Sequence, residues 1–583
     1  MHWPTWCRLR LQASEVGPLS GSAAGGFGPS RRWAWAVAGI GVVASLPLVL
    51  LGFPHPTIDG ICYLQWAENF SAQFWQGELY PRWLRDLNHG LGSPVFFYYP
   101  PLSFWVAALL QPLATASLSS WQTLGWASAL AVVASGLAAW VWLRGMVGSV
   151  QALVGAVAYM LAPYRVALTL LERGGYPEHC AFVWMPLVLW GIQRQHLRLP
   201  SGWVCTALAF AGFFLTHTPT TVTFTPLAVL YALGMSWRTA WATVGAGIVG
   251  AALAAVYWVP ALSTLDWIQP GYWQTPYWML FFSPKAVLTA PFALADGSQR
   301  ANLCFLGLVV TVVCLCPSSL CRHAAAAPLR LRRVWWAMAV VVVVLMLPIS
   351  LWLYDLLWPL RMIQFPWRFL APGSLIWAGL IALAWPEPTA PAWMRVLHGE
   401  VVLITGLMLV ALTARAYAAT CLAPPLRLGR VPARIDPMGR DVGEYQPASA
   451  QTAAARLQMK TNQVLVLRGS AQAKILAWRP RHMTVDVQSD TGAHLLLRQF
   501  YYPGWMAQTS QGLVLPLKPD EATGVLSLDV PPGPHTIHLR LKPKLPERLG
   551  WAITLAAVLV LGFRTARIHC CRWAIARCHW CRG

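Results

Sequence analysis

Residues 121–143 read WQTLGWASALAVVASGLAAWVWL, a run without a charged side chain. A run of about 20 apolar residues matches the roughly 30 Å hydrocarbon core of a bilayer, at about 1.5 Å of helix rise per residue. Similar runs recur outward from this one towards both ends of the chain. The pattern predicts a polytopic α-helical membrane protein.

Thirteen apolar segments are candidate crossings: 33–53, 102–117, 121–143, 149–171, 180–193, 203–217, 219–235, 240–262, 302–317, 334–354, 369–385, 396–417 and 549–563. An odd number would place the two basic termini on opposite sides of the membrane, whereas Lys and Arg favour the cytoplasm. Counting from the Arg-bearing loops leaves 102–117, which Pro112 interrupts, as the segment that does not cross. We therefore expect about 12 spans.

Composition agrees with a membrane protein, since 57% of the 583 residues are hydrophobic and 11% are charged. The net charge of +22 comes largely from Arg residues scattered between apolar segments or gathered at the termini. This distribution favours positive-inside bias and contact with anionic lipid over nucleic-acid binding.

The basic tail carries Cys570, Cys571, Cys578 and Cys581 beside His579, but without two spaced CxxC pairs. It indicates a reduced cytoplasmic tail more than a zinc site.

The chain divides into four expected parts. They are a cytoplasmic basic N-terminus at 1–32, a transmembrane domain at 33–417 with an external loop at 54–101, an extracytoplasmic β-rich domain at 418–547, and a last transmembrane helix with a basic cytoplasmic tail at 548–583. The β-rich domain follows from period-two alternation at 483–487, 526–530 and 537–541, with turns at 502–505 and 531–534. Short alternating strands separated by turns predict a small β-sandwich.

Unusual polar residues gather on the external side once the loops are assigned. Asp59 follows the first span, and the other candidates are Arg82, Arg85, Asp86, His89, Glu172, Arg173, Glu178, His217, Arg361 and Arg368. A carboxylate there can act as general base towards a hydroxyl, and Arg can hold a phosphate by paired hydrogen bonds. The residues predict a catalytic cleft at the outer membrane interface.

Each candidate also has a structural alternative. Asp59 can cap a helix, the Arg85/Asp86 and Glu172/Arg173 neighbours can be loop charges, His217 can be a hydrogen-bonded helix-end histidine, and Arg361 and Arg368 can anchor lipid headgroups. Residue spacing alone leaves these alternatives open.

A family resemblance runs through the same residues. Asp59-Gly60, Tyr80-Pro-Arg-Trp83, Asn88-His-Gly-Leu-Gly-Ser-Pro94 and Phe96-Phe-Tyr-Tyr-Pro-Pro101 resemble bacterial integral membrane proteins described as 6-pyruvoyl-tetrahydropterin synthase-related. The resemblance continues through Ala162-Pro-Tyr-Arg165, Glu172-Arg-Gly-Gly-Tyr-Pro-Glu178, Leu215-Thr-His-Thr218, Phe365-Pro-Trp-Arg-Phe369 and Tyr501-Tyr-Pro-Gly-Trp505. It therefore covers nearly the whole chain.

That group is similar in architecture to the GT-C glycosyltransferases. The resemblance implies a multi-pass protein of the bacterial inner membrane that takes a sugar from a polyprenyl-phosphate donor. The sugar would pass to a glycan, lipid or protein acceptor outside the cytoplasm. Asp59 would be the base, Glu172 or Glu178 the second acidic position, and Arg361 or Arg368 the partner of the leaving phosphate.

Metal dependence and the broad class of function stay open at this point. A divalent cation could be held by two spaced acids, although some members of the superfamily work without one. Two other classes fit the same sequence features. One is a flippase or transporter of lipid-linked sugars, and the other is a non-catalytic scaffold for envelope assembly.

Overall fold

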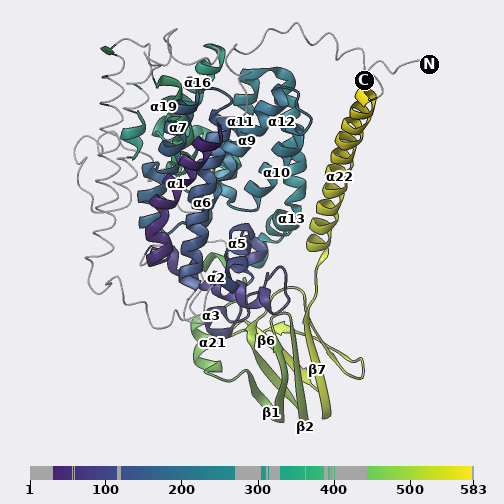
Figure 1. Cartoon of the computed structure of the whole chain (residues 1–583). Helices are drawn as coiled ribbons and strands as arrows, with labels where there is room; N and C mark the ends of the chain where they lie inside the picture. Colours follow the sequence, from purple (N-terminus) through teal and green to yellow (C-terminus); the bar gives the residue numbers. More distant parts are fainter. Residues whose placement is uncertain are drawn as a thin grey trace.

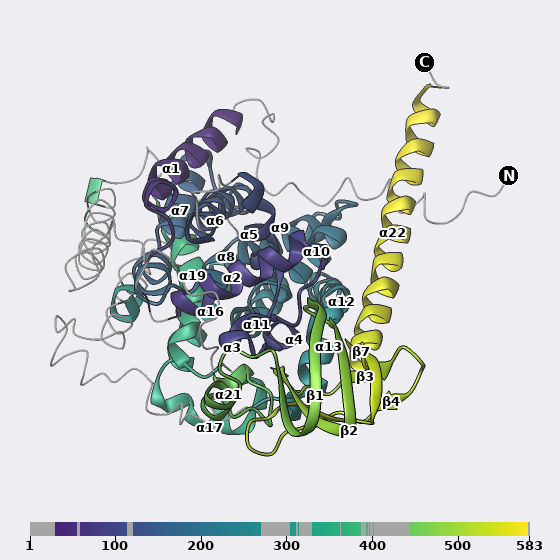
Figure 2. The same ribbon diagram turned by 90° about the horizontal axis from the view of Figure 1, so that it is seen from below.

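A helical body rests on a C-terminal β-sheet, and a long last helix lies beside the body (Figure 1). The computed structural model describes residues 30–54, 57, 59–113, 120–269, 304–309, 313, 329–361, 363–385, 392, 393, 396, 400 and 443–580, the last 13 of these by their backbone. Seen from below, the sheet covers one end of the helices (Figure 2). The side chains of the cysteine-bearing tail and residues 418–442 of the expected β-rich domain fall outside this description.

Most of the helical body comes from the first two thirds of the chain. Its α-helices are α1 (Ser30–Leu51), α2 (Gly60–Trp75), α3 (Leu87–Gly90), α4 (Val95–Tyr98), α5 (Leu102–Leu110), α6 (Ser120–Leu143), α7 (Ser149–Met160), α8 (Tyr176–Ala181), α9 (Trp184–His196), α10 (Gly202–Phe214), α11 (Thr218–Met235), α12 (Trp237–Leu253), α13 (Ala255–Ser263), α16 (Leu329–Leu345), α17 (Leu351–Leu356), α18 (Trp358–Arg361) and α19 (Leu370–Ala384). A π-helix, η4, spans Tyr164–Glu172, and the 3₁₀ segments include η8 (Pro348–Ser350), η9 (Pro366–Phe369) and η10 (Gly443–Tyr445). Helices α21 (Thr452–Met459) and α22 (Leu545–Trp580) flank the strands.

Five helices in the described part are long and apolar enough to cross a membrane. They are Arg31–Leu51, Trp121–Leu143, Ser149–Glu172, Pro366–Ala384 and Leu545–Arg567. Two bent pairs raise the number to 7 if each is one span: Trp237–Leu253 with Ala255–Ser263, bent by 75°, and Arg330–Leu345 with Pro348–Leu356, bent by 89°. The expected count of about 12 is not reached, because several apolar runs form helices of fewer than 18 residues and others lie outside the described residues.

The described part of the segment at 102–117, residues 102–113, forms a short helix. Helix α5 has nine residues and passes into a 3₁₀ turn at Gln111–Leu113, which contains Pro112. A crossing needs about 20 residues, so this stretch of helix is too short to span a bilayer. Residues 114–117 fall outside the description.

The strands form one antiparallel sheet, and the expected two-layer sandwich is wrong in this respect. Its strands are β1 (Val464–Arg479), β2 (His482–Phe500), β3 (Trp505–Thr509), β4 (Val514–Leu515), β5 (Lys518–Pro519), β6 (Val525–Val530) and β7 (Gly533–Leu541). The 19-residue β2 pairs with β1 on one side, and on the other side with β7 and then with β6. The strands that the sequence pattern assigns to two separate layers are therefore joined into one sheet by the long strand β2.

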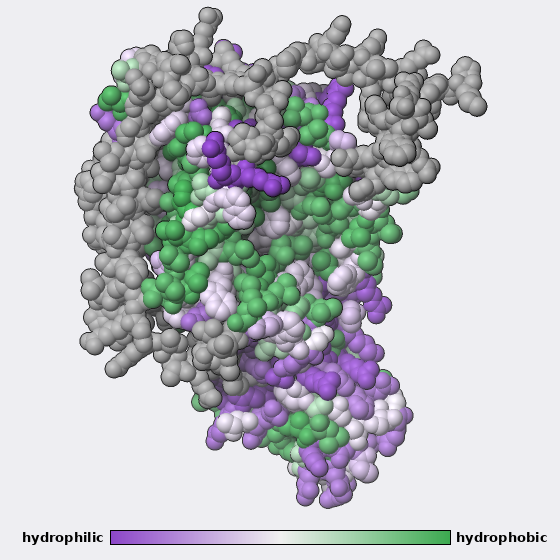
Figure 3. All heavy atoms as spheres, in the orientation of Figure 1, coloured by the Kyte–Doolittle hydropathy of each residue, from purple (hydrophilic) through white to green (hydrophobic). Residues whose placement is uncertain are grey.

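The alternating apolar side chains of the sheet are buried as predicted. Val485, Leu528 and Leu539 are each 2% exposed or less, while the body above the sheet carries an apolar surface (Figure 3). Figure 3 also shows hydrophilic residues concentrated over the sheet. This division suits a helical body in lipid and a sheet in water.

Helix α22 packs against the break between α12 and α13. The Thr554 hydroxyl accepts a hydrogen bond from the Val256 N–H at 2.9 Å and lies 3.3 Å from the Ala252 carbonyl oxygen. Gly550 permits the close approach, since a Cβ there would lie 2.7 Å from the Ala255 carbonyl oxygen. The last helix thus binds backbone groups that the broken helix leaves without partners.

Candidate functional site

A pocket of about 610 Å³ opens where the helical body meets the loops above the sheet. Five separate parts of the chain supply its acidic and basic side chains: the start of α2, the stretch from the end of η4 into α8, the start of α11, η9 and η10. Seven of its charged or ionisable residues are Asp59, Glu172, Arg173, Glu178, His217, Arg368 and Glu444. The pocket therefore gathers six of the eleven predicted site residues.

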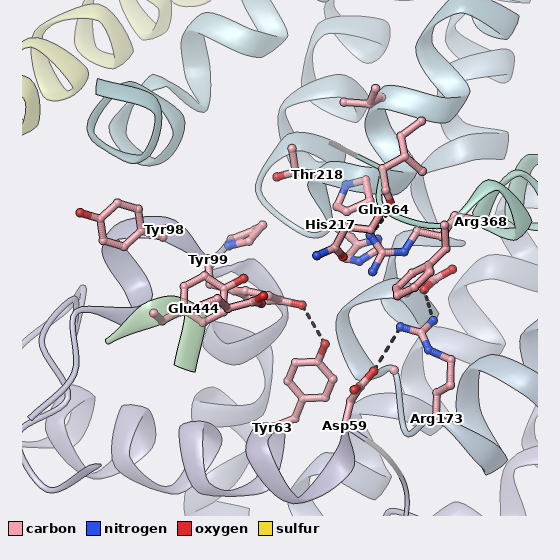
Figure 4. Close-up of a pocket in the computed structure, with 18 of the residues that line it drawn as sticks. Asp59, Tyr63, Tyr98, Tyr99, Arg173, His217, Thr218, Gln364, Arg368 and Glu444 are labelled. Carbon is pink, nitrogen blue, oxygen red and sulfur yellow. Dashed lines mark hydrogen bonds and ion pairs between the residues drawn. The ribbon is translucent and has the colours of Figure 1, made fainter. Parts of the chain in front are cut away.

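Arg173 lies between two carboxylates and binds both. Its Nη2 is 3.1 Å from Asp59 Oδ2, and its Nη1 is 2.8 Å from Glu178 Oε2. Figure 4 shows Asp59 and Arg173 on one side of the pocket, with both ion pairs drawn. Asp59 keeps 34% of its side chain exposed, whereas Glu178 keeps 2%. Asp59 can thus meet a ligand while Glu178 is enclosed.

A backbone hydrogen bond also joins the start of α2 to the loop between η4 and α8. The Asp59 N–H donates to the Arg173 carbonyl at 2.8 Å. Gly174 has φ +65, and a Cβ there would lie 2.1 Å from Thr57 Oγ1 and 3.0 Å from Gly60 Cα. Only glycine fits such a close approach without displacing a neighbour. The Asp59 side chain makes no capping hydrogen bond to α2, so its carboxylate is directed to the pocket and Arg173.

Glu178 is held as an anion by its surroundings. Burial raises the pKa of this carboxyl, but the charges of Arg173, His217 and Arg368 and the Tyr164 hydrogen bond outweigh burial and lower it to about 2. The π-helix η4 carries Tyr164 at its start and leads directly into Arg173. Such π-helical turns are rare and are frequently found at functional sites. Here the segment supports Glu178 from both ends.

His217 and Arg368 form a second polar group across the pocket from Asp59 (Figure 4). Burial lowers the pKa of His217 to about 3, Glu178 opposes that shift, and Arg368 and Arg173 reinforce it, so the imidazole is neutral at pH 7. Its Nδ1 is 2.7 Å from Thr220 Oγ1. Arg368 is 8% exposed and donates from Nη1 to the Ile363 carbonyl at 2.9 Å. None of the described acidic residues forms an ion pair with Arg368, which makes it a candidate anion-binding group.

Aromatic side chains line the rest of the pocket. The Tyr63 and Tyr99 hydroxyls are 3.0 Å apart, and the Trp66 ring lies 5.0 Å from Tyr99 and 5.7 Å from Tyr445. Trp367 packs its ring 4.8 Å from the Arg173 guanidinium. Aromatic faces with hydroxyl tips suit a ligand that has both apolar and polar parts.

The carboxylates do not fit a divalent cation in this arrangement. Asp59 and Glu178 already share the fixed positive charge of Arg173, which a bridging ion would have to displace. Across the described part of the chain, no three His, Cys, Asp or Glu residues are grouped as metal ligands.

Five predicted site residues lie outside the pocket lining. Arg85 makes a two-pronged ion pair with Asp86, at 2.7 and 2.6 Å, and also donates to the Trp478 carbonyl of β1. The His89 carbonyl accepts two hydrogen bonds from Arg498. These contacts join the first loop to the sheet, which is why they face away from the pocket.

Arg82 and Arg361 also serve contacts within the protein. Arg82 donates to the Val256 carbonyl at 2.8 Å and lies 3.6 Å from Glu547, which is in turn 3.5 Å from Arg481. Glu78 is held nearby by Gln73, at 3.3 Å. Arg361 is paired with Asp355 at 3.2 Å on the surface. We call Glu78, Arg82, Arg481 and Glu547 the junction cluster, because they connect the first loop, the sheet and α22.

Sequence reasoning missed Gln364, Glu444 and most of the aromatic lining. Tyr99 and Trp367 fall within the quoted motifs 96–101 and 365–369, so those motifs already marked their neighbourhood. Glu444 and Tyr445 come from the part of the expected β-rich domain that precedes its first alternating stretch. No pattern in the sequence indicates that this segment reaches the pocket.

Comparisons with known proteins give distant structural likenesses. No family model matches the chain, and no curated protein matches it. The arabinofuranosyltransferase AftD from Mycobacteria is similar with a TM-score of 0.44 and 18% identity over 67% of this chain and 27% of that one. This chain thus spans 27% of the length of that enzyme.

Two further structures differ in how similar they are to this chain. The archaeal oligosaccharyltransferase AglB from Archaeoglobus fulgidus, solved with an inhibitory peptide and a dolichol-phosphate, has a TM-score of 0.41 and 12% identity over 74% of this chain and 58% of that one. ArnT from Cupriavidus metallidurans has a TM-score of 0.24 and 14% identity over 60% and 78%.

Proposed function

We propose that the chain is a membrane glycosyltransferase that moves a sugar from a polyprenyl-phosphate donor to an envelope glycan, lipid or protein on the non-cytoplasmic face. The observation that carries the proposal is the pocket itself. It holds a partly exposed carboxylate, Asp59, opposite a buried arginine without an acidic partner among the described residues, Arg368. A base facing an anion-binding group suits the displacement of a phosphate by a hydroxyl.

The proposed reaction forms one bond to the sugar and breaks another. The acceptor oxygen attacks the anomeric carbon of the sugar as its proton passes to Asp59. The bond between that carbon and the phosphate oxygen breaks, and the oxygen keeps the electron pair. Arg368 stabilises the charge that develops on the leaving phosphate, because paired N–H groups match phosphate oxygens. Neutral His217 can add a hydrogen bond on the same side.

Arg173 and the two glutamates support the base in this proposal. Arg173 fixes the Asp59 carboxylate through one oxygen and leaves the other for the acceptor. Glu178 holds Arg173, and Glu172 lines the pocket next to Arg173 in the chain. The fixed cation between Asp59 and Glu178 supplies the positive charge that a metal would bring, so the proposed reaction needs no divalent cation.

The proposal assigns the lipid to the apolar part of the pocket. Leu168, Val222 and Ile363 line it beside the polar groups, and their surroundings belong to the helical body. The segment that leads into the sheet lines the pocket with Glu444 and Tyr445 of η10. We assign the acceptor to that side, because a glycan or protein would approach from water.

The test compares a host strain that lacks the gene with the same strain restored by wild type, through mass profiles of envelope glycans and lipid-linked sugars. A transferase predicts that a sugar disappears from the envelope while its lipid-linked donor accumulates outside the cytoplasm. A transporter predicts accumulation on the cytoplasmic side, and a scaffold predicts no change in the donor. Either of the last two results contradicts the proposal.

Sidedness is tested separately. Cysteines introduced in place of Leu79 in the first loop and Leu513 at the sheet, both exposed, should react with a membrane-impermeant maleimide added outside intact cells. Labelling that requires permeabilised cells would place the pocket on the cytoplasmic side and reject the proposed orientation.

A further inference from the structure

Gln364 has a backbone conformation that is costly for its side chain. Its φ is +65, in the left-handed region that favours glycine. Among the residues that the structure describes, four other non-glycine residues have positive φ: Asn88, His89, Arg198 and Lys460. Of these five residues, only Gln364 lines the pocket.

A tight turn enforces this conformation. The Gln364 N–H donates to the Arg361 carbonyl at 3.2 Å, and the Phe365 N–H donates to the Ile363 carbonyl at 2.8 Å. Phe365 is extended, with φ −127 and ψ 116, as a residue before proline should be. The turn reverses the chain so that Ile363 and Arg368 both line the pocket. Glycine would make the same turn without strain.

The side chain of Gln364 therefore needs a reason beyond the turn. Figure 4 shows it gathered with His217 and Arg368 on one side of the pocket. Its carboxamide makes no hydrogen bond to any residue that the structure describes. A half-buried amide with two donors and an acceptor available, kept on a strained backbone, is a ligand-binding arrangement.

We propose that Gln364 is a specificity-determining residue that binds a hydroxyl of the donor sugar. This inference rests on the proposed function. Arg368 marks the position of the phosphate, and the group bonded to that phosphate is the sugar, so the neighbouring amide meets a ring hydroxyl. An amide can donate to one hydroxyl oxygen and accept from another, which distinguishes sugars by the placement of those groups.

Two variants separate this role from a structural one. Gln364→Gly removes the amide and relieves the backbone strain, while Gln364→Asn keeps an amide that is shorter by one methylene on a residue that tolerates positive φ. Both should keep a thermal midpoint at or above that of wild type. Both should lower the envelope sugar formed per molecule of protein by about five- to tenfold, the effect of losing one hydrogen bond. Arg198→Gly is the matched control, because Arg198 has φ +53 on an exposed turn outside the pocket.

The control should match wild type in sugar transfer. A Gln364→Gly variant that is stable and forms the full amount of envelope sugar would overturn the inference and leave the proposed function standing. A gene deletion that changes no envelope glycan would reject the proposed function itself. The two failures are therefore distinguishable within one set of strains.

Discussion

Two glutamates, Glu178 in the pocket and Glu78 in the junction cluster, respond to their surroundings in opposite ways. Glu178 is surrounded by cations, whose charges outweigh its burial and lower its pKa to about 2. Burial raises the pKa of Glu78 to about 7, and the nearby Arg481, Gln73 and Arg82 only partly oppose that shift. The same residue type therefore supports the fold in different pH ranges.

Glu178→Gln should destabilise the protein at pH 7. The folded pKa of Glu178 lies below its ordinary 4.5, so the charged group contributes stability above pH 4.5 that is lost as the pH falls towards 2. Removing one partner of a buried pair costs on the order of 3 kcal/mol. Thermal midpoints of wild type and variant in detergent should differ at pH 7 and converge as the pH falls. A difference that is unchanged at pH 3 would contradict this electrostatic account.

Glu78→Gln should have the opposite sign. The folded pKa of Glu78 lies above 4.5, so its favourable contribution is present below pH 4.5 and is lost as the pH rises through about 7. The variant should therefore be more stable than wild type at pH 8, with the gain disappearing near pH 5. The same melting series measures both effects. A variant that is less stable than wild type at pH 8 would show that the Glu78 anion holds the junction cluster together.

Close contacts between helices and loops hold individual elements in place around the site, and these contacts cannot be predicted from the sequence. Gly174 lets the η4–α8 loop touch the start of α2, and Thr554 lets α22 cover the break between α12 and α13. Helix α13 in turn carries Tyr257 and Leu262 into the pocket lining. Both contacts therefore position an element that contributes residues to the pocket.

Gly174→Ala should separate Asp59 from Arg173. A Cβ at this position collides with Thr57, and alanine also disfavours φ +65. We expect a loss of at least about 1 kcal/mol of stability and a greater than tenfold loss of sugar transfer. Gly39→Ala is the control, because a Cβ at Gly39 meets nothing within 4 Å. Unchanged transfer by Gly174→Ala would show that the loop contact does not position the site.

Thr554→Val should destabilise the broken helix. It keeps the shape of the side chain but removes the oxygen that accepts from the Val256 N–H. An unsatisfied backbone donor in an apolar setting costs about 1–3 kcal/mol. Thr554→Ser retains the hydroxyl and should stay close to wild type, so thermal midpoints of the two variants provide the comparison. Equal thermal midpoints for the Val and Ser variants would show that the Thr554 hydroxyl does not stabilise the broken helix.

For the molecule as a whole, the sequence predicts composition-driven features well. Apolar runs identify the long spans, and alternation at 483–487 and 537–541 identifies buried strands of the sheet. The predicted count of about 12 crossings is not confirmed, because hydropathy does not reveal where a helix breaks and several apolar runs lie outside the described residues. The 75° bend after Leu253 is an example, since its exposed backbone groups are satisfied by Thr554, about 300 residues later.

For the site, too, the sequence predicts some residues correctly and others not. Charge parity placed Asp59, Glu172 and Glu178 on one face, and the pocket contains all three. It also grouped Arg82 and Arg85 with them, although these arginines bind Glu547, Asp86 and carbonyls of other elements. Whether an arginine faces a ligand or a neighbouring helix depends on tertiary contacts. Gln364 was missed because its signal is a backbone angle.

The central claim is that Asp59 accepts the proton from an acceptor hydroxyl. The most direct measurement is the amount of envelope sugar restored to the deletion strain by wild type, by Asp59→Asn and by Asp529→Asn, at equal membrane abundance. Asp529 is an exposed carboxylate of the sheet and serves as the control. The account predicts full restoration by wild type and Asp529→Asn, and at least a hundredfold loss with Asp59→Asn. Full restoration by Asp59→Asn would contradict it.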